Sequence, residues 1–245
     1  MKLNIAIDQG NTATKVSLFD GLTLVSNKKY KALNISDIEQ LLSENEIGVA
    51  IYSSVQKRNE EIENLLHERL DKCLILSYKT PMPMTIDYAT PHTLGNDRIA
   101  AAVGALCEMP EKNVLIIDAG TAVTLDLLNK KGHFVGGNIT PGLRTRFESL
   151  HNFTDKLPLI DEDGDIPLIG YDTSTAIRAG VVNGLVSEIE GYIDCVTKEI
   201  GDLTVFMTGG DSQFLAKRIK SPIFGDENLL SKGLNRILLY NNESI

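Results

Sequence analysis

The stretch Ile5-Ala6-Ile7-Asp8-Gln9-Gly10-Asn11-Thr12 decides the fold, because its pattern returns later as Ile116-Ile117-Asp118-Ala119-Gly120-Thr121. In both stretches an apolar run, typical of a buried strand, ends at an aspartate that a glycine and a threonine follow. Each stretch leads into a second β-rich run, so each predicts a hairpin whose turn carries the aspartate. The recurrence predicts two related halves that face each other across a cleft, with both aspartate turns pointing into it.

Alternating β and α segments surround the two hairpins. Ser36 and Glu39 form a capping-box pattern for the first helix, and the proline-containing segment 78–94 predicts a loop long enough to be functional. From hydrophobic periodicity we expect strands over 3–7, 15–19, 22–25, 48–52, 73–77, 114–117, 123–128, 134–139 and 203–207, and helices over 37–45, 57–70, 97–107, 172–200, 212–219 and 226–240.

Composition narrows the class of protein. The chain has 245 residues and a formal net charge of -9, which argues against a nucleic-acid partner because such binding relies on clustered cations. The N-terminal apolar run is too short for a signal peptide and no stretch approaches a membrane span, so we expect a cytoplasmic protein without a membrane partner. Cys73, Cys107 and Cys195 lack the spacing of a zinc site or a disulfide framework and are expected to be small buried residues.

The first aspartate turn offers groups that suit a phosphate chain. Its backbone N–H groups, the Thr12 hydroxyl and the Lys15 ammonium can meet phosphate oxygens, while Asp8 can hold a hydrated magnesium ion. Taken alone, an ordinary Asn-Gly hairpin turn explains these residues equally well. The second turn, 118–121, changes the balance, because two such turns could grip a phosphate chain from opposite sides. Two carboxylates near phosphates require cations between them, so the pair predicts a metal-dependent activity.

A third candidate is Gly95-Asn96-Asp97-Arg98, which opens an alanine-rich helix. Asp97 could accept the proton of an acceptor hydroxyl, and Arg98 could pair with a substrate carboxylate or carbonyl. The alternative is that Asp97 only complements the helix dipole.

Glycines mark three further segments, each with two interpretations. The turn Gly209-Gly210-Asp211 could let a flat nucleobase approach, or Asp211 could simply cap the next helix. The stretch 136–142 suits either a wall close to a ligand or a sharp bend. Gly180 and Gly184, near the apolar stripe of the long helix, indicate close packing against another backbone or are merely tolerated.

Together and in this order, the motifs resemble the type III pantothenate kinase family, within the superfamily of acetate and sugar kinases, actin and chaperone ATPases. The resemblance spans nearly the whole chain and implies an α/β fold of two ribonuclease-H-like (actin-like ATPase) halves, 1–112 and 113–245. Mixed β-sheets flanked by helices and a nucleotide cleft between the halves are part of that expectation. The segments that carry the resemblance are Asp8–Thr12, Leu94–Arg98, Asp118–Ala122, Gly136–Gly142 and Thr208–Asp211.

The resemblance implies transfer of the ATP γ-phosphoryl group to the primary hydroxyl of pantothenate, which gives 4'-phosphopantothenate in the first step of coenzyme A biosynthesis. Asp97 resembles the general base, Asp8 the carboxylate near Mg²⁺, and Asp118 the ligand of a monovalent cation, K⁺ or NH₄⁺. The implied nucleotide contacts are Asp8, Gln9, Gly10, Asn11, Thr12, Ala13, Thr14, Lys15 and Thr121, and the implied pantothenate contacts are Tyr88, Gly95, Asn96, Asp97, Arg98 and Thr173.

The family resemblance also implies a homodimer whose pantothenate site is built from both subunits, and Gly180 and Gly184 would fit such an interface. Gln9 departs from the family pattern, in which a small or β-branched residue is more usual before the glycine, and this could alter how the turn meets phosphates.

Two other functions remain open at this point. A kinase of the same superfamily with another small-molecule acceptor would share the two aspartate turns. A non-catalytic relative that acts as a transcriptional accessory factor would keep the fold, although the retention of Asp8, Asp97, Arg98 and Asp118 argues against it.

Overall fold

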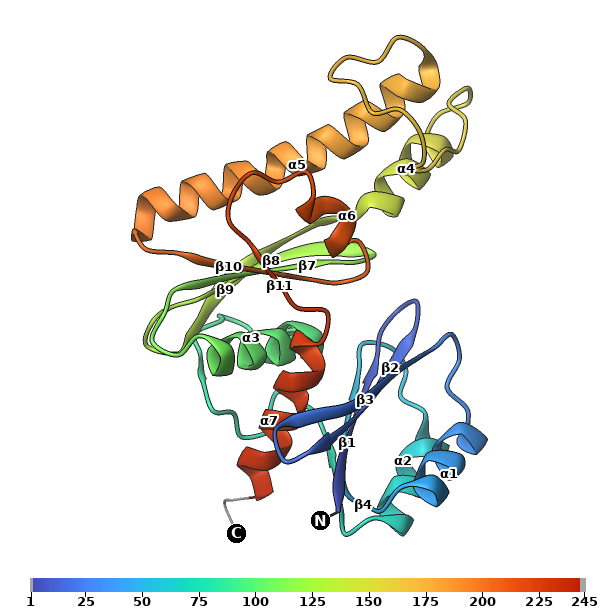
Figure 1. Cartoon of the computed structure of the whole chain (residues 1–245), viewed down its shortest axis with the longest axis vertical. Helices are drawn as coiled ribbons and strands as arrows, with labels where there is room; N and C mark the ends of the chain where they lie inside the picture. The colour runs from blue at the N-terminus through green and yellow to red at the C-terminus, as the bar shows by residue number, and fades with distance from the viewer. Residues whose placement is uncertain (1, 243–245) are drawn as a thin grey trace. The chain divides into compact units, whose positions relative to one another are not determined.

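The computed structural model describes residues 2–242, which build two β-sheets with flanking helices (Figure 1). In the first sheet the central strand β1 pairs antiparallel with β2 and parallel with β4. Its strand order is β3-β2-β1-β4-β5, with bounds β1 Leu3–Gln9, β2 Thr14–Asp20, β3 Thr23–Tyr30, β4 Ile47–Ser54 and β5 Lys72–Ile75.

The second sheet repeats this order. Its strands are β6 Thr85–Ile86, β7 Val114–Ala119, β8 Ala122–Leu128, β9 His133–Pro141, β10 Thr204–Thr208 and β11 Phe224–Gly225, arranged β11-β10-β7-β8-β9-β6. Read from β9, the order β9-β8-β7-β10-β11 matches that of the first sheet strand for strand, and β10 pairs parallel with β7 as β4 does with β1. The predicted duplication is therefore confirmed.

The helices follow the predicted alternation. They are α1 Ile35–Glu44, α2 Glu60–Arg69, a short 3-10 helix Pro91–Thr93, α3 Asn96–Glu108, α4 Leu143–Asn152, α5 Thr173–Ile200, α6 Ser212–Ala216 and α7 Leu229–Asn242. Within residues 2–242, none of them has both the length and the apolar character that a membrane-spanning helix needs.

Two compact units divide the chain. Unit 1 holds the chain up to Glu111, residues 128–136 and the chain from Asn228 onward, and unit 2 holds Lys112–Leu127 and Gly137–Glu227. The helix α7 belongs to unit 1, where it crosses α3 so closely that a Cβ at Gly233 would overlap the Ala100 carbonyl oxygen. The units thus differ from the expected halves 1–112 and 113–245, which stay a prediction.

One apolar cluster of unit 1 lies on one face of its sheet. Ile5 and Ile7 of β1 pack there with Ile38 of α1 and Ile62 of α2. Because side chains alternate along a strand, Asn4, Ala6 and Asp8 point to the other face. The hydrogen bond from Asn4 Nδ2 to Asn235 Oδ1, 2.9 Å long, shows that α7 covers this second face.

Unit 2 is organised in the same way. Leu115, Ile117 and Ala119 of β7 pack with Val181 and Leu185 of α5 in one apolar cluster. Figure 1 shows α5 running along the sheet on this side. The alternation again leaves the aspartate of the strand, Asp118, on the opposite face.

Several expectations need correction. The helix α1 begins at Ile35, and its start is capped by Asn34, whose backbone N–H donates to Asp37 at 2.9 Å, so the predicted Ser36 and Glu39 capping box is wrong. The strand β3 runs to residue 30 because pairing with β2 continues beyond the apolar run that ended the prediction at residue 25. The helix α6 ends at residue 216 rather than 219, and α7 begins three residues later than predicted. Cys107 and Cys195 are exposed rather than buried.

Candidate functional site

Asp8 is a buried carboxylate at the end of β1. Its residue is 9% exposed, and strand pairing places Lys15 of β2 on one side and Ser53 of β4 on the other. Burial and, to a smaller extent, the negative charge of Asp97 raise the pKa of Asp8 to about 6, although the positive charge of Lys15 opposes the shift. Ionised Asp8 is therefore unfavourable in the absence of a ligand, and a cation bound beside it would stabilise its negative charge.

The turn after Asp8 is held by its backbone carbonyl groups. Gly10 N donates to Ala13 O at 3.1 Å and closes the turn. From the segment after β4, Gln56 Nε2 donates to the carbonyl oxygens of Gly10 and Asn11, both at 2.9 Å. Since these bonds occupy carbonyl groups, they fix the turn without using the N–H groups of Asn11 and Thr12.

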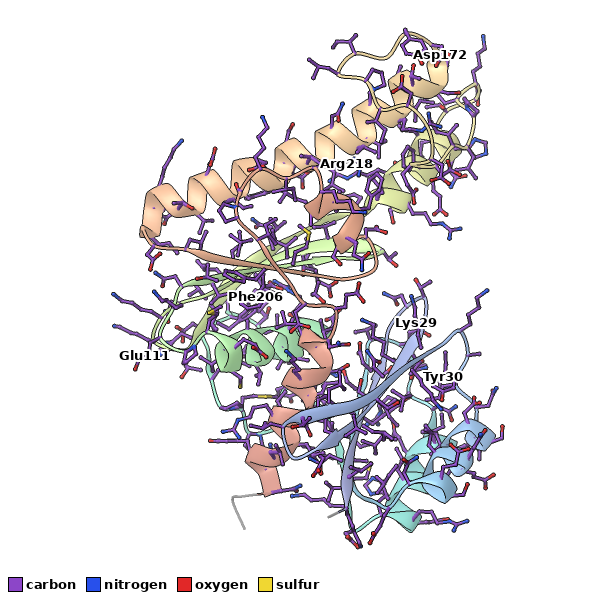
Figure 2. All side chains as sticks on the ribbon, viewed as in Figure 1. Lys29, Tyr30, Glu111, Asp172, Phe206 and Arg218 are labelled. Atoms are coloured by element: carbon purple, nitrogen blue, oxygen red, sulfur yellow. The ribbon has the colours of Figure 1, made fainter. Side chains whose placement is uncertain are left out.

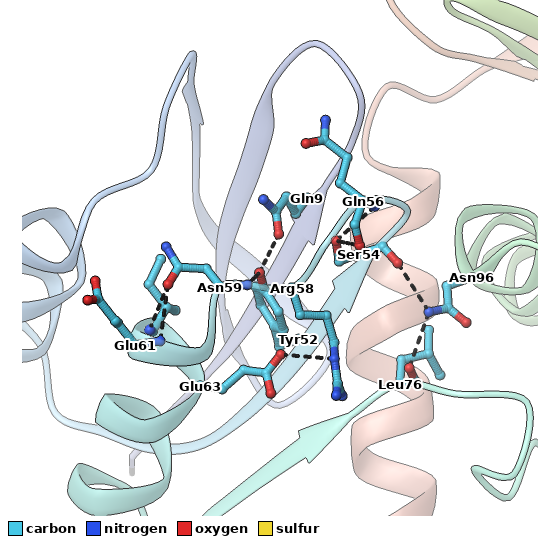
Figure 3. Close-up of polar contacts among 11 residues, drawn as sticks. Gln9, Tyr52, Ser54, Gln56, Arg58, Asn59, Glu61, Glu63, Leu76 and Asn96 are labelled. Carbon is cyan, nitrogen blue, oxygen red and sulfur yellow. Dashed lines mark hydrogen bonds and ion pairs between the residues drawn. The ribbon is translucent and has the colours of Figure 1, made fainter.

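Gln9 points away from Asp8. It follows Asp8 on the strand, so its side chain lies on the opposite face, where the Tyr52 hydroxyl donates to Gln9 Oε1 and accepts from Asn59 N at 3.3 Å (Figure 3). Next to the turn lies a pocket of about 270 Å³, which these three side chains line together with Lys31 and Gln56. The side chain of Gln9 thus bonds to a residue of β4 and does not face Asp8.

Asp97 sits in the first turn of α3, and Gly95 gives its carboxylate room. Asp97 Oδ1 accepts from Arg98 N at 2.8 Å, and a Cβ at Gly95 would overlap this oxygen. Asn96 Nδ2 donates to Leu76 O at 3.2 Å and to Ser54 O at 3.5 Å, which ties the start of α3 to the residue after β5 and to the end of β4. The carboxylate is therefore positioned by its own backbone and by glycine.

Arg98 is a buried cation flanked by aromatic rings. It is 6% exposed, and its guanidinium carbon lies 5.6 Å from the ring centroid of Tyr88 and 5.7 Å from that of Phe134. Such stacking limits the orientation of the planar fork. Unit 1 therefore brings Tyr88 close to Arg98, and Gly95 and Asn96 lie beside Arg98 at the start of α3. That these residues contact a substrate stays a prediction.

The second aspartate turn, in unit 2, is built from close backbone contacts. Gly120 N donates to Ala122 O and Gly142 N to Thr121 O, both at 3.0 Å, and a Cβ at Gly142 would overlap the Gly120 carbonyl oxygen. In the stretch 136–142, Gly142 is thus required because the backbone of Gly120 approaches it too closely for a side chain. Thr121 itself is exposed.

Asp118 faces the glycine turn that follows β10. Gly209 has a φ of +94°, and a Cβ there would overlap the Ala119 carbonyl oxygen and the Asp118 carboxylate. Asp211 N donates to Ala119 O at 2.9 Å, while burial raises the pKa of the Asp211 carboxyl. Asp211 occupies the N-cap position of α6, as one of the two interpretations expected, but its side chain makes no cap hydrogen bond.

Thr173 is the first residue of α5 and is exposed. The helix begins there because Asp172, labelled in Figure 2, accepts from Thr175 N at 2.8 Å. Thr173, Thr121 and Asp118 lie in unit 2, whereas the other predicted site residues lie in unit 1.

Sequence reasoning missed three residues beside the first turn: Tyr52, Ser53 and Gln56. Their roles arise from the parallel pairing of β4 with β1, in which Tyr52 lies opposite Ile7 and Ser53 opposite Asp8. No local motif marks them, and only the position of Ser53 at the end of a buried apolar run pointed to that edge of the sheet.

The residues present fit a nucleotide with its divalent metal. Magnesium is usually held by one or two carboxylates, by water and by substrate phosphates. The Ser53 and Thr208 hydroxyls are buried and have no hydrogen-bond partner among the described residues, and strand register places them opposite Asp8 and Asp118. A carboxylate beside a hydroxyl that still needs a partner is an oxygen-rich environment suited to hydrated cations.

Comparison with known proteins agrees with this chemistry. A model of the type III pantothenate kinase family matches residues 4–195. A type III pantothenate kinase of Azobacteroides pseudotrichonymphae is 44% identical over 96% of this chain and 96% of its own length.

Two solved structures show the fold alone. A Campylobacter jejuni protein named as a conserved Baf family transcriptional activator has a TM-score of 0.64 at 23% identity, over 98% of this chain and 99% of that chain. MreB 5 of Spiroplasma citri, bound to AMPPNP, has a TM-score of 0.51 at 11% identity, over 100% of this chain and 99% of that chain. The predicted actin-like α/β class is confirmed.

The raised pKa of Asp8 predicts a gain in stability from Asp8→Asn. Because the folded-state pKa of about 6 lies above the ordinary aspartate value of 3.8, ionisation opposes folding as pH rises between these values. At pH 7, without nucleotide or metal, the variant should have a free energy of unfolding greater by about 2 to 3 kcal/mol. Urea unfolding at pH 7 and at pH 3.5 measures this, and the gain should disappear at the lower pH. An equal gain at both pH values would contradict the interpretation.

Proposed function

Because the chain belongs to the type III pantothenate kinase family, its activity is the ATP-dependent phosphorylation of pantothenate, and we propose how its residues perform it. The observation that carries the proposal is the start of α3. There, the Asp97 carboxylate is close enough to Asp8 to raise its pKa, and it is next in sequence to the buried cation Arg98. A base, a metal-binding carboxylate and an anion-binding group are thus all contributed by unit 1.

Asp97 acts as the general base. It accepts the proton of the pantothenate primary hydroxyl as that oxygen bonds to the γ-phosphorus of ATP and the bond from the γ-phosphorus to the bridging oxygen breaks, which releases ADP. No covalent enzyme intermediate is needed. The Gly95 backbone supports this role, because the absence of a Cβ lets the Asp97 carboxylate occupy its position.

The first turn, from Asp8 to Lys15, binds the phosphates. Apart from the Gly10 N–H, which closes the turn, its N–H groups and the Lys15 ammonium would stabilise negative charge, and Asp8 would hold the hydrated magnesium ion. Bound magnesium supplies positive charge that neutralises the phosphate oxygens. The Gln56 bonds to the carbonyl oxygens of Gly10 and Asn11 keep the turn in shape for this task.

Arg98 binds the carboxylate of pantothenate, with Tyr88 beside it. The guanidinium is a planar fork that suits a carboxylate, and its stacking near Tyr88 and Phe134 keeps it oriented. Asn96 and Thr173 complete the proposed contacts. The nearby rings also give the uncharged part of the substrate an apolar surface.

Asp118 binds a monovalent cation, K⁺ or NH₄⁺, and Thr121 contacts the nucleotide. The support is the turn beside Asp118, where the absence of a side chain at Gly209 lets the backbone approach both the Asp118 carboxylate and the Ala119 carbonyl oxygen. Oxygen ligands of this kind suit hard cations.

The protein acts in the cytoplasm as a homodimer. Gly180 and Gly184 are exposed on α5 with no atom within 4 Å of a built Cβ, so no described residue of this chain packs against them. Nearby exposed apolar side chains include Leu168, 86% exposed, and Ile169, 80% exposed. A surface of this kind, with room for a close helix approach, favours a second copy as its partner.

Substitution of the base should lower turnover much more than nucleotide binding. We expect Asp97→Asn to reduce kcat by about 100-fold or more, because general-base catalysis contributes roughly 10² to 10⁴. Its dissociation constant for Mg·ADP should stay within about 3-fold of the wild-type value. Phosphate transfer to pantothenate and calorimetric titration measure the two quantities, with the exposed Asp71→Asn as control. Equal loss of turnover and binding would refute the assignment.

The cation proposal predicts that Asp118→Asn removes the response to potassium. Wild-type phosphate transfer should rise by at least about 10-fold when K⁺ or NH₄⁺ replaces Na⁺, since the cation would lower the transition state by about 1.4 kcal/mol or more. The variant should show the same low rate in all three salts. A wild-type rate that is independent of the salt would exclude the role of Asp118.

The dimer proposal predicts that Gly184→Arg yields a monomer. The new side chain has open space within the chain, so it should not unfold the subunit but should block approach of a second copy. Sedimentation velocity and the KM for pantothenate measure the effect, with Glu199→Arg at the far end of α5 as control. We expect a dimer for wild type and control, and a monomer with raised KM for the variant. A dimeric variant would show that this face is not the interface.

A further inference from the structure

Ser53 has a buried hydroxyl that the fold of unit 1 does not use. It is 0% exposed, and its Oγ has no hydrogen-bond partner among the described residues. Buried hydroxyls are normally bonded, because loss of water without a replacement partner is unfavourable. The stability of the fold therefore gives no reason for a serine at this position, and an alanine would fit the same space.

The position of Ser53 is beside the proposed metal carboxylate. In the parallel pairing of β4 with β1, Ser53 lies directly opposite Asp8, so both side chains emerge on the same face of the sheet. The next residue, Ser54, accepts from the Asn96 side chain through its carbonyl oxygen, which links this edge of the sheet to the start of α3. The hydroxyl is therefore near the groups that the reaction uses.

The same arrangement recurs in unit 2. Thr208 of β10 lies opposite Asp118 of β7, is 0% exposed, and its Oγ1 is likewise without a partner. The two hydroxyls occupy equivalent strands of the duplicated topology. A single unpartnered hydroxyl could be incidental, but its recurrence beside the corresponding aspartate points to a shared requirement.

Ser17 shows that a buried serine on a strand of the same sheet can be satisfied. It is also 0% exposed, and its hydroxyl bonds to Ser231 Oγ at 2.9 Å and to Asn27 Oδ1 at 3.3 Å. The sheet of unit 1 thus contains one buried serine whose hydroxyl stabilises the fold and one whose hydroxyl does not.

We propose that Ser53 is a positioning residue for the magnesium nucleotide. Its hydroxyl would form a hydrogen bond to a water molecule bound to the magnesium ion beside Asp8. This inference rests on the proposed function, because it assigns a partner to a group beside its metal carboxylate. Mg²⁺ retains several of its waters in proteins, and such waters need hydrogen-bond partners that fix them. Ser53 acts through that water and touches neither pantothenate nor the γ-phosphorus.

The experiment compares Ser53→Ala with the matched control Ser17→Ala in the full chain. Thermal unfolding of the protein without ligand gives stability, and calorimetric titration with ADP, in excess Mg²⁺ and in EDTA, gives affinity with and without metal. Ser53→Ala should unfold at the wild-type temperature or higher and lose about 10-fold in affinity for Mg·ADP, which corresponds to about 1.4 kcal/mol. Its affinity for metal-free ADP should be unchanged. Ser17→Ala should show the reverse, with a lower unfolding temperature and unchanged Mg·ADP affinity.

The inference is overturned if Ser53→Ala binds Mg·ADP within 2-fold of wild type, or if it loses affinity equally with and without metal. Failure of Ser53→Ala to fold also overturns it, because the argument holds that the hydroxyl supports no other part of the fold. Ser53→Cys, which keeps the volume and replaces the hydroxyl by a weak donor, should reproduce the metal-specific loss. Phosphate transfer by wild type tests the proposed function separately, so a wild-type enzyme with an unaffected Ser53 variant contradicts this inference alone.

Discussion

The pairing of β1 with an antiparallel strand on one side and a parallel strand on the other is the constraint on which the site depends. It fixes which face Asp8 occupies, and it sets Lys15 and Ser53 as the neighbours of Asp8. Ile5 and Ile7 pack into the apolar cluster on the other face of the sheet. A shift of one residue in the pairing register would therefore move them out of that cluster. The edge of the sheet that carries Asp8 is therefore specified by the same contacts that hold unit 1 together.

This arrangement places negative charge where water is scarce. Asp8 is buried, the charge of Asp97 acts on it, and Lys15 offsets the resulting rise in pKa only in part. The proximity of the two negative charges lowers the stability of the protein without a ligand, and a bound cation would remove this penalty. The site is thus prepared for a metal–nucleotide complex at the expense of stability, which is common where a fold orients charged groups in advance.

The sequence predicted what depends on local patterns and missed what depends on pairing between distant segments. The two aspartate turns and the long helix α5 follow from alternation, turn residues and apolar periodicity. Ser53 and Gln56 gain their roles from β4 lying beside β1, more than 40 residues away in the chain. The assignment of α7 to unit 1 depends likewise on Gly233, whose lack of a side chain permits the crossing with α3 but leaves no local signal.

Gln9 and Asp8 are neighbours in the chain, but their side chains serve different parts of unit 1. Alternation along β1 turns Gln9 toward Tyr52 on the core side while Asp8 faces the other way, so a change at residue 9 is absorbed by local packing. The shape of the turn is set instead by the Gln56 bonds to backbone carbonyl oxygens, which do not depend on the side chains of the turn. The side chain at residue 9 can therefore change without altering the backbone of the turn, provided that its new partner lies on the core side.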